Sequence, residues 1–167
     1  MNKQTSNLNN ARLSIEYYLT GHGWADCQIS IGTTLCKISA SYLSDALKKL
    51  ILSAIAILNE SHSISIGFDE EPGEYRWSLV QIDGGKIELK LLEFKQLWGY
   101  LPDSKGTQLM CATIQPIEFA EAVATAATKA FDRYGAIEYK NRWGAHEFPD
   151  AELNLLLKYI TQYAENH

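Results

Sequence analysis

Apolar and polar residues alternate along the first forty positions of the chain. Every second side chain is apolar over residues 13–18, and after a glycine-containing break at 21–23 a second alternation covers 25–31. A period of two places all the apolar side chains on one face of a strand. The pattern therefore predicts a β-hairpin, followed by a third short strand over residues 34–39.

The spacing of apolar residues then changes to three or four. From Leu43 to Leu58 they recur at helical intervals, which predicts a helix over residues 42–59. Ser41 is the expected N-cap, because its hydroxyl can accept a hydrogen bond from a free backbone N–H of the first turn. The apolar stripe is wide, so we expect the helix to lie deeply against a sheet.

The second half of the chain returns to strands and ends in helices. Strands are expected over 63–68, 75–82, 86–95 and 107–115, and helices over 116–134, 136–143 and from 149 onward. Tight turns between consecutive strands favour antiparallel pairing. The predicted fold class is α+β: a twisted antiparallel sheet of about six or seven strands, with one central helix and C-terminal helices packed on it.

The length fits this organisation. A chain of 167 residues is in the usual size range of one domain and needs no disulfide or metal to be stable. We expect a single α+β domain over residues 11–167. Residues 1–10 are polar and rich in asparagine, which predicts a flexible N-terminus.

Charge and cysteine content narrow the classes of function. The net charge of −5 argues against nonspecific binding to nucleic acid or to an anionic membrane. Cys27, Cys36 and Cys111 each lie in an apolar strand pattern without a C-x-x-C pair, so we expect buried structural thiols and no metal. No hydrophobic signal core or membrane-spanning run is seen, and the expected location is the cytoplasm.

An acidic turn is the most distinctive stretch of the sequence. Asp69, Glu70, Glu71 and Glu74 surround Pro72-Gly73, although a turn needs only the proline and the glycine. The carboxylates could bind a hard cation or act as an acid–base pair. They could also form a solvated turn in which one carboxylate pairs with Arg76. The fourth possibility is a surface that binds a basic protein, whose approach it would steer.

Aromatic residues supply candidate anchors for such a surface. Trp77 lies in a strand on the same face as Leu79, which favours the core, whereas Trp98 and Tyr100 lie in a loop where exposure and burial are equally open. The sequence has no G-x-S-x-G, H-E-x-x-H or phosphate-binding glycine loop. We therefore expect no enzyme activity, no catalytic residues and no cofactor.

Three motifs resemble those of short bacterial proteins without an assigned function. They are SYLSDAL at residues 41–47, DEEPGEYRW at 69–77 and Y-x-x-R-W-G at 139–144. In size and make-up such proteins are similar to immunity proteins, which neutralise toxin domains in bacterial competition. The resemblance implies a protein partner and attaches no catalytic role to any residue.

The sequence thus favours an immunity or inhibitor protein that binds a bacterial toxin domain, with a basic nuclease as one candidate. Its expected contact residues are Asp69, Glu70, Glu71, Glu74, Trp98 and Tyr100. The alternative is a small-molecule-binding protein or enzyme with a pocket between sheet and helices, lined by Tyr17, Arg76 and Trp77. A third possibility is a dimer formed through an exposed sheet edge.

Overall fold

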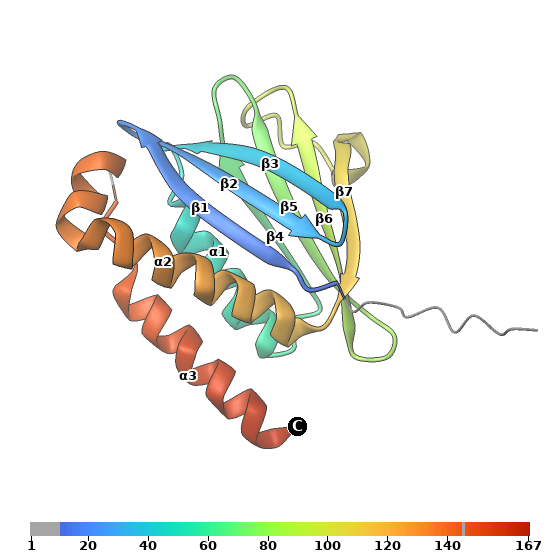
Figure 1. Cartoon of the computed structure of the whole chain (residues 1–167). Helices are drawn as coiled ribbons and strands as arrows, with labels where there is room; N and C mark the ends of the chain where they lie inside the picture. Colours follow the sequence, from blue (N-terminus) through green and yellow to red (C-terminus); the bar gives the residue numbers. More distant parts are fainter. Residues whose placement is uncertain (1–10, 145) are drawn as a thin grey trace, which may run out of the picture.

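Seven strands form two antiparallel sheets rather than one. The computed structural model describes residues 11–144 and 146–167, and within them the strand orders are β1-β2-β3 and β4-β5-β6-β7 (Figure 1). The α+β class and the number of strands agree with the prediction, but the expected single sheet is wrong. Alternation shows which residues share a face and says nothing about which strands pair. The expected flexible segment 1–10 lies outside the described residues.

The elements follow the predicted order. The strands are β1 (Ser14–Gly21), β2 (Trp24–Ile31), β3 (Thr34–Ser41), β4 (Ser63–Asp69), β5 (Glu74–Ile82), β6 (Lys86–Phe94) and β7 (Thr107–Ile114). The helices are α1 (Ala46–Leu58), α2 (Pro116–Trp143) and α3 (Asp150–Asn166), and a short 3-10 helix covers Asp103–Lys105. The two helices expected between residues 116 and 143 are both within α2, which is interrupted at Gly135, where φ is 65° and ψ is 174°.

The predicted N-cap of the central helix is wrong. Helix α1 begins at Ala46 with Asp45 in the N-cap position, and neither Asp45 nor another side chain caps it. Ser41 instead ends β3, and its hydroxyl accepts a 3.4 Å hydrogen bond from the N–H of Leu43. Apolar spacing alone did not separate the connecting residues 42–45 from the helix that follows them.

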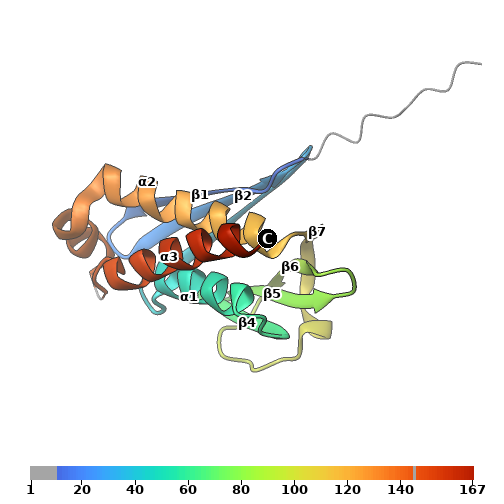
Figure 2. The same ribbon diagram turned by 90° about the horizontal axis from the view of Figure 1, so that it is seen from below.

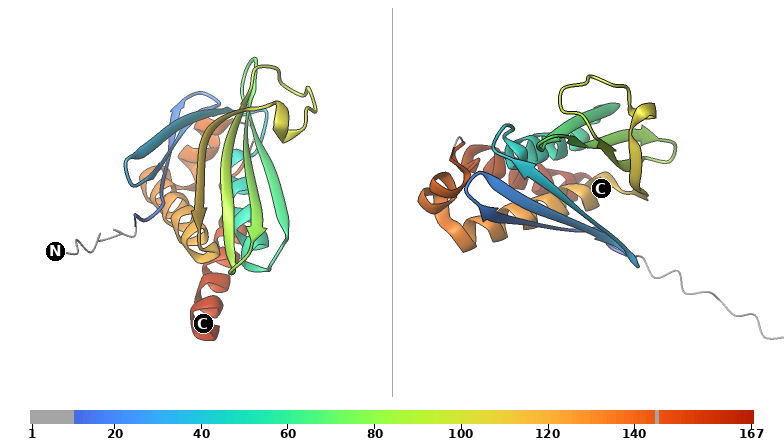
Figure 3. Two further views of the ribbon diagram at one scale, coloured as in Figure 1. Left: turned by 90° about the vertical axis from the view of Figure 1, so that its right-hand side faces the viewer. Right: turned by 90° about the horizontal axis from the view of Figure 1, so that it is seen from above.

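The helices pack on one another and on both sheets (Figure 2). Helix α2 lies against β1, α1 lies against β4, and α3 packs on α1 and α2. Figure 3 shows the blue strands of the first sheet and the green and yellow strands of the second as separate sheets. Buried apolar side chains from both sheets and all three helices belong to one hydrophobic cluster. Because apolar residues alternate along each strand, a single face of each sheet supplies these side chains.

The second sheet is also covered on its other face. Leu92 and Phe94 lie opposite the helix-facing side chains of β6, yet both are buried. The connection between β6 and β7, residues 95–106, passes over them. Gly106 lies so close to Phe94 that a Cβ at this position would be 2.7 Å from a ring carbon. A side chain at position 106 would therefore push the connection away from the sheet.

The prediction that the three cysteine thiols are buried is confirmed for two of them. Cys27 and Cys36 are buried in the first sheet, whereas Cys111 is exposed on β7, so the expectation of a buried thiol is wrong there. Cys111 lies on the same face of the second sheet as its register partner Lys90. None of the helices in the described part of the chain is sufficiently long and apolar to cross a membrane.

Candidate protein-binding surface

The acidic turn closes the hairpin between β4 and β5. Asp69 and Glu74 are register partners at its base, and the N–H of Glu70 donates a 2.9 Å hydrogen bond to the carbonyl of Gly73. Gly73 is buried, and a Cβ there would be 2.4 Å from the carbonyl oxygen of Phe94. Glycine is thus needed because the turn presses against the end of β6.

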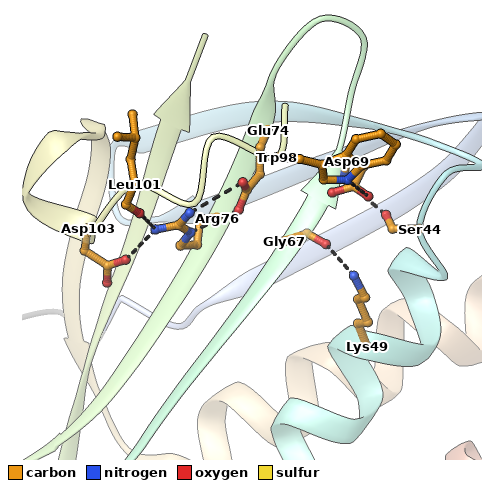
Figure 4. Close-up of polar contacts among 9 residues, drawn as sticks. All are labelled: Ser44, Lys49, Gly67, Asp69, Glu74, Arg76, Trp98, Leu101 and Asp103. Atoms are coloured by element: carbon orange, nitrogen blue, oxygen red, sulfur yellow. Dashed lines mark hydrogen bonds and ion pairs between the residues drawn. The ribbon is translucent and has the colours of Figure 1, made fainter. Parts of the chain in front are cut away.

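Glu74 is neutralised within the protein. Its Oε1 accepts a 3.0 Å hydrogen bond from Nε of Arg76, and both side chains are only 13% exposed. Arg76 also donates to Oδ1 of Asp103 at 2.9 Å and to the carbonyl of Leu101 at 2.7 Å (Figure 4). Burial lowers the pKa of Arg76, but the hydrogen bonds to Glu74 and Asp103 outweigh burial and raise it. For this one carboxylate, the arrangement is the predicted pairing with Arg76.

The other three carboxylates of the turn have no cationic partner. Within residues 11–144 and 146–167, no ion pair reaches Asp69, Glu70 or Glu71. Oε1 of Glu70 accepts a 2.7 Å hydrogen bond from the hydroxyl of Ser39, and Glu71 is exposed. The nearby Lys49 donates instead to the carbonyl of Gly67 at 3.3 Å (Figure 4). The turn therefore keeps a concentrated negative charge.

An aromatic loop, residues 96–102, lies beside the acidic turn. Trp98 is 58% exposed and Tyr100 is 89% exposed. Both have positive φ, 54° and 50°, a region in which residues other than glycine are uncommon. Nε1 of Trp98 donates a 3.4 Å hydrogen bond to Oδ2 of Asp69 (Figure 4). Strained backbone of this kind persists only where the surrounding contacts hold it, and it clusters at functional sites.

Backbone contacts hold the loop on both sides of the aromatics. The N–H of Leu97 donates a 2.7 Å hydrogen bond to the carbonyl of Pro72, which ties the loop to the acidic turn. Three residues after Trp98, the carbonyl of Leu101 is bound by Arg76. Trp98 and Tyr100 are thus exposed side chains on an anchored backbone.

The structure places the predicted contact residues in one region and reveals what supports them. Sequence analysis missed the supporting residues Ser39, Leu101 and Asp103. It considered Arg76 as a partner for one carboxylate and as part of the alternative pocket, and did not anticipate that Arg76 binds the loop. A signal was present in the strand over residues 86–95, where Leu92 and Phe94 are apolar at positions that alternation assigns to the outer face. Such an exception indicates that a further segment covers the outer face.

The alternative pocket does not form as expected. Tyr17 and Trp77 are buried in the core, whereas Arg76, the neighbour of Trp77 on β5, points to the opposite face of the sheet. These three side chains do not line a common cavity. In the described ranges, no group of three or more His, Cys, Asp or Glu residues is placed to hold a metal ion.

Comparison with known proteins adds no relative. No family model, curated protein or solved structure matches the chain. A proposal for the function therefore rests on the geometry of the acidic turn and the aromatic loop.

Proposed function

We propose that the protein is an immunity or inhibitor protein that binds a basic toxin domain through the acidic turn, residues 69–74, and the aromatic loop, residues 96–102. One observation carries the proposal. Trp98 and Tyr100 have exposed side chains and a backbone held at positive φ. They lie beside three carboxylates that have no cationic partner in the described chain. The motif resemblance to short bacterial proteins, similar in make-up to immunity proteins, supports a toxin domain as the partner.

The aromatics are suited to be the anchors of this contact. Tyrosine and tryptophan are enriched among the few residues that carry most of the binding energy of an interface. Ordering a loop on binding costs free energy, and that cost is smaller where the loop is already held. The hydrogen bonds of Leu97 and Leu101 hold it on either side of Trp98 and Tyr100.

The carboxylates are suited to select a basic partner. Asp69, Glu70 and Glu71 concentrate part of the net negative charge of the chain, which is −5, on one turn. Complementary charge raises the association rate and disfavours partners of the same sign. A nuclease is one such partner, since its substrate-binding surface is basic and carboxylates can take the places of phosphates. In this proposal Glu74 supports the loop from within and does not contact the partner.

Affinity capture from the cells that produce the protein tests the proposal. Wild-type protein is compared with the double variant Trp98→Ala/Tyr100→Ala and with the double variant Glu70→Lys/Glu71→Lys. We expect wild type to retain a basic toxin domain, identified by mass spectrometry, and each variant to lose at least about tenfold in affinity, in line with truncation of hot-spot residues. Glu74 is left unchanged because its replacement would disturb Arg76.

A matched control separates this surface from general stickiness. Ile137 on α2 is 81% exposed and apolar, so Ile137→Ala removes a similar exposed side chain elsewhere. Its binding should equal that of wild type. Equal binding by wild type and both surface variants would rule out this surface as the binding site. Capture of only acidic partners would rule out the basic toxin domain.

A further inference from the structure

Strand β7 forms an edge of the second sheet that the rest of the described chain leaves uncovered. Figure 1 shows it on the right-hand side of that sheet, and it pairs with β6 alone. No helix of the described residues packs along it, whereas α2 packs along β1 and α1 along β4. Strand β3 of the first sheet contacts β7, but no backbone hydrogen bond other than those of the β6–β7 ladder reaches residues 107–113.

The opposite edge of the same sheet shows how the chain covers an edge strand. At β4, Nζ of Lys49 donates a 3.3 Å hydrogen bond to the carbonyl of Gly67. The N–H of Asp69 donates a 3.1 Å hydrogen bond to the hydroxyl of Ser44. Outward backbone groups of β4 are thus occupied from α1 and from the residues before it. In the part of the chain that the structure describes, no side chain takes this role at β7.

The side chains of β7 agree with an open edge. Met110 and Ile114 are buried and belong to the core. Cys111 and Thr113 are exposed, and they lie on the other face of the sheet. Leu109 is 37% exposed although it is apolar. The strand therefore exposes an apolar side chain together with a free backbone edge.

The sequence of β7 has none of the residues that usually protect an open edge. Natural edge strands are blunted by charged residues, by proline or by a bulge. Residues 107–114 read TQLMCATI and contain no charged residue, proline or glycine. The register with β6 shifts once, before Met110, and is regular from Met110 to Ile114. Because short, uncharged segments of high strand propensity readily pair with other chains, this edge is suited to an additional strand.

A second copy of β7 fits this edge. In an antiparallel pair, residues directly opposite each other share a face of the sheet and contact each other. With a twofold axis at Cys111, that residue lies opposite its own copy. Met110 then lies opposite Ala112, and Leu109 lies opposite Thr113. None of these side chains is charged, so no like charges meet across the axis.

The charged residues beside this axis are balanced. Lys90 on β6 is the register partner of Cys111, and its Nζ lies 2.8 Å from Oε1 of Glu88 on the same strand. This ion pair neutralises the outer face of the sheet next to the axis. A neutral surface of this kind favours neither an acidic nor a basic strand, and it suits the uncharged β7 of a second copy.

We propose that two copies of the chain pair antiparallel through β7, with Cys111 on the twofold axis, so that their second sheets join into one. Main-chain hydrogen bonds between the two strands hold the dimer, as in other cases of strand addition. A twofold contact that uses the same surface on both copies is the commonest form of dimer. Residues 69–74 and 96–102 are not part of this contact, so it does not depend on the proposed toxin-binding surface.

Sedimentation velocity of the full chain under reducing conditions, over a wide range of protein concentration, tests the proposal. We expect wild type to shift from monomer to dimer as the concentration rises. Cys111→Lys and Cys111→Glu each place two like charges opposite each other at the axis, and each should raise the dissociation constant at least about tenfold. An equimolar mixture of the two variants pairs opposite charges and should recover the dimer. This recovery also shows that both variants are folded.

The matched control lies on the same face at the other edge of the sheet. Ser65 of β4 is exposed, and the register places it in one row with Ser78, Lys90 and Cys111. Ser65→Lys and Ser65→Glu introduce the same charges at this position. Both variants should dimerise as wild type does.

Cross-linking with oxidised glutathione tests the position of the axis. Cys27 and Cys36 are buried, so the reagent reaches Cys111. Two Cys111 side chains at the axis are close enough for a disulfide, which requires Cα atoms within about 7 Å, and wild type should form a covalent dimer. In Cys111→Ser/Thr113→Cys the new thiol is also exposed but lies opposite Leu109. Its covalent dimer should form at least about tenfold more slowly, because the two thiols are too far apart.

Three results would overturn the proposal. The first is a monomer at every concentration, which would leave the edge to a strand of another protein. The second is dimerisation of Cys111→Lys and Cys111→Glu, each alone, as strong as that of wild type, which would place the contact elsewhere. The third is equally fast cross-linking through positions 111 and 113, which would exclude the axis at Cys111.

Discussion

Two neighbouring residues of β5 lie in opposite environments. Trp77 points toward the helices and is fully buried, with its ring 5.6 Å from that of Phe68 and 6.2 Å from that of Phe119. Arg76 points to the other face, where its guanidinium lies 4.0 Å from the ring centre of Phe94 and binds the loop that follows β6. One face of the sheet is held by apolar packing and belongs to the main core. The other is covered by the connection after β6, which Arg76 and a backbone hydrogen bond to Pro72 hold in place, and it carries the exposed aromatics.

The helix-facing side should be the more sensitive to truncation. Trp77→Ala removes a large, fully buried ring, and such changes typically cost about 3–5 kcal/mol of unfolding free energy. Denaturant unfolding measures this loss. Trp98→Ala is the matched control, since the same residue type is 58% exposed there, and its cost should stay within about 0.5 kcal/mol. Equal losses in the two variants would contradict the assignment of Trp77 to the core.

Removing the cation on the opposite face should have the next largest effect. Arg76→Met leaves Glu74 without its partner and releases the carbonyl of Leu101, at an expected cost of about 2–3 kcal/mol, below the range for a fully buried pair. Hydrogen exchange should accelerate across residues 96–106 while Trp77 stays buried. Binding through Trp98 and Tyr100 should weaken, although neither residue is altered.

A second substitution checks the cause of that loss. Glu74→Gln added to Arg76→Met removes the carboxylate that the first change left alone. The double variant should therefore recover part of the lost stability, because an unpaired, partly buried charge is no longer present. A double variant less stable than Arg76→Met would show that Glu74 acts through contacts other than this pair.

The contrast also explains which parts of the fold were predictable. All seven strands were predicted, the first two from a period-two pattern that arises because the core demands apolar side chains on one face of each sheet. Trp77 and Leu79 follow the same rule. The covering of Leu92 and Phe94 was not predicted, because residues 95–106 form a non-periodic connection. Its position depends on the contacts of Arg76 with Leu101 and Asp103, which are 25 and 27 residues further along the chain.

The candidate site was predictable to a similar extent. Clustering along the chain identified the acidic turn, and the loop composition drew attention to Trp98 and Tyr100. The sequence analysis left open which carboxylate pairs with Arg76. In the fold, Glu74 pairs with Arg76 on the same strand, whereas Glu70 accepts a hydrogen bond from Ser39, which is distant in the sequence. The division into two sheets was not predicted for a related reason: strand pairing depends on contacts between strands, which the pattern within each strand does not show.

A less buried ion pair away from both faces should have the smallest effect and sharpens the comparison. Oε1 of Glu152 on α3 lies 3.1 Å from Nζ of Lys48 on α1, and both side chains are more exposed than those of Arg76 and Glu74. The pKa of Glu152 is lowered mainly by a hydrogen bond from its own backbone and also by Lys48.

A carboxylate whose pKa is lower in the folded than in the unfolded state stabilises the fold at a pH above its unfolded pKa. That stabilisation is lost as the pH falls through the folded pKa. Glu152→Gln should therefore reduce Tm by about 1–3 °C at pH 7, and the difference from wild type should shrink below about pH 4. A difference that persists at low pH would show that the pair does not act through its charge.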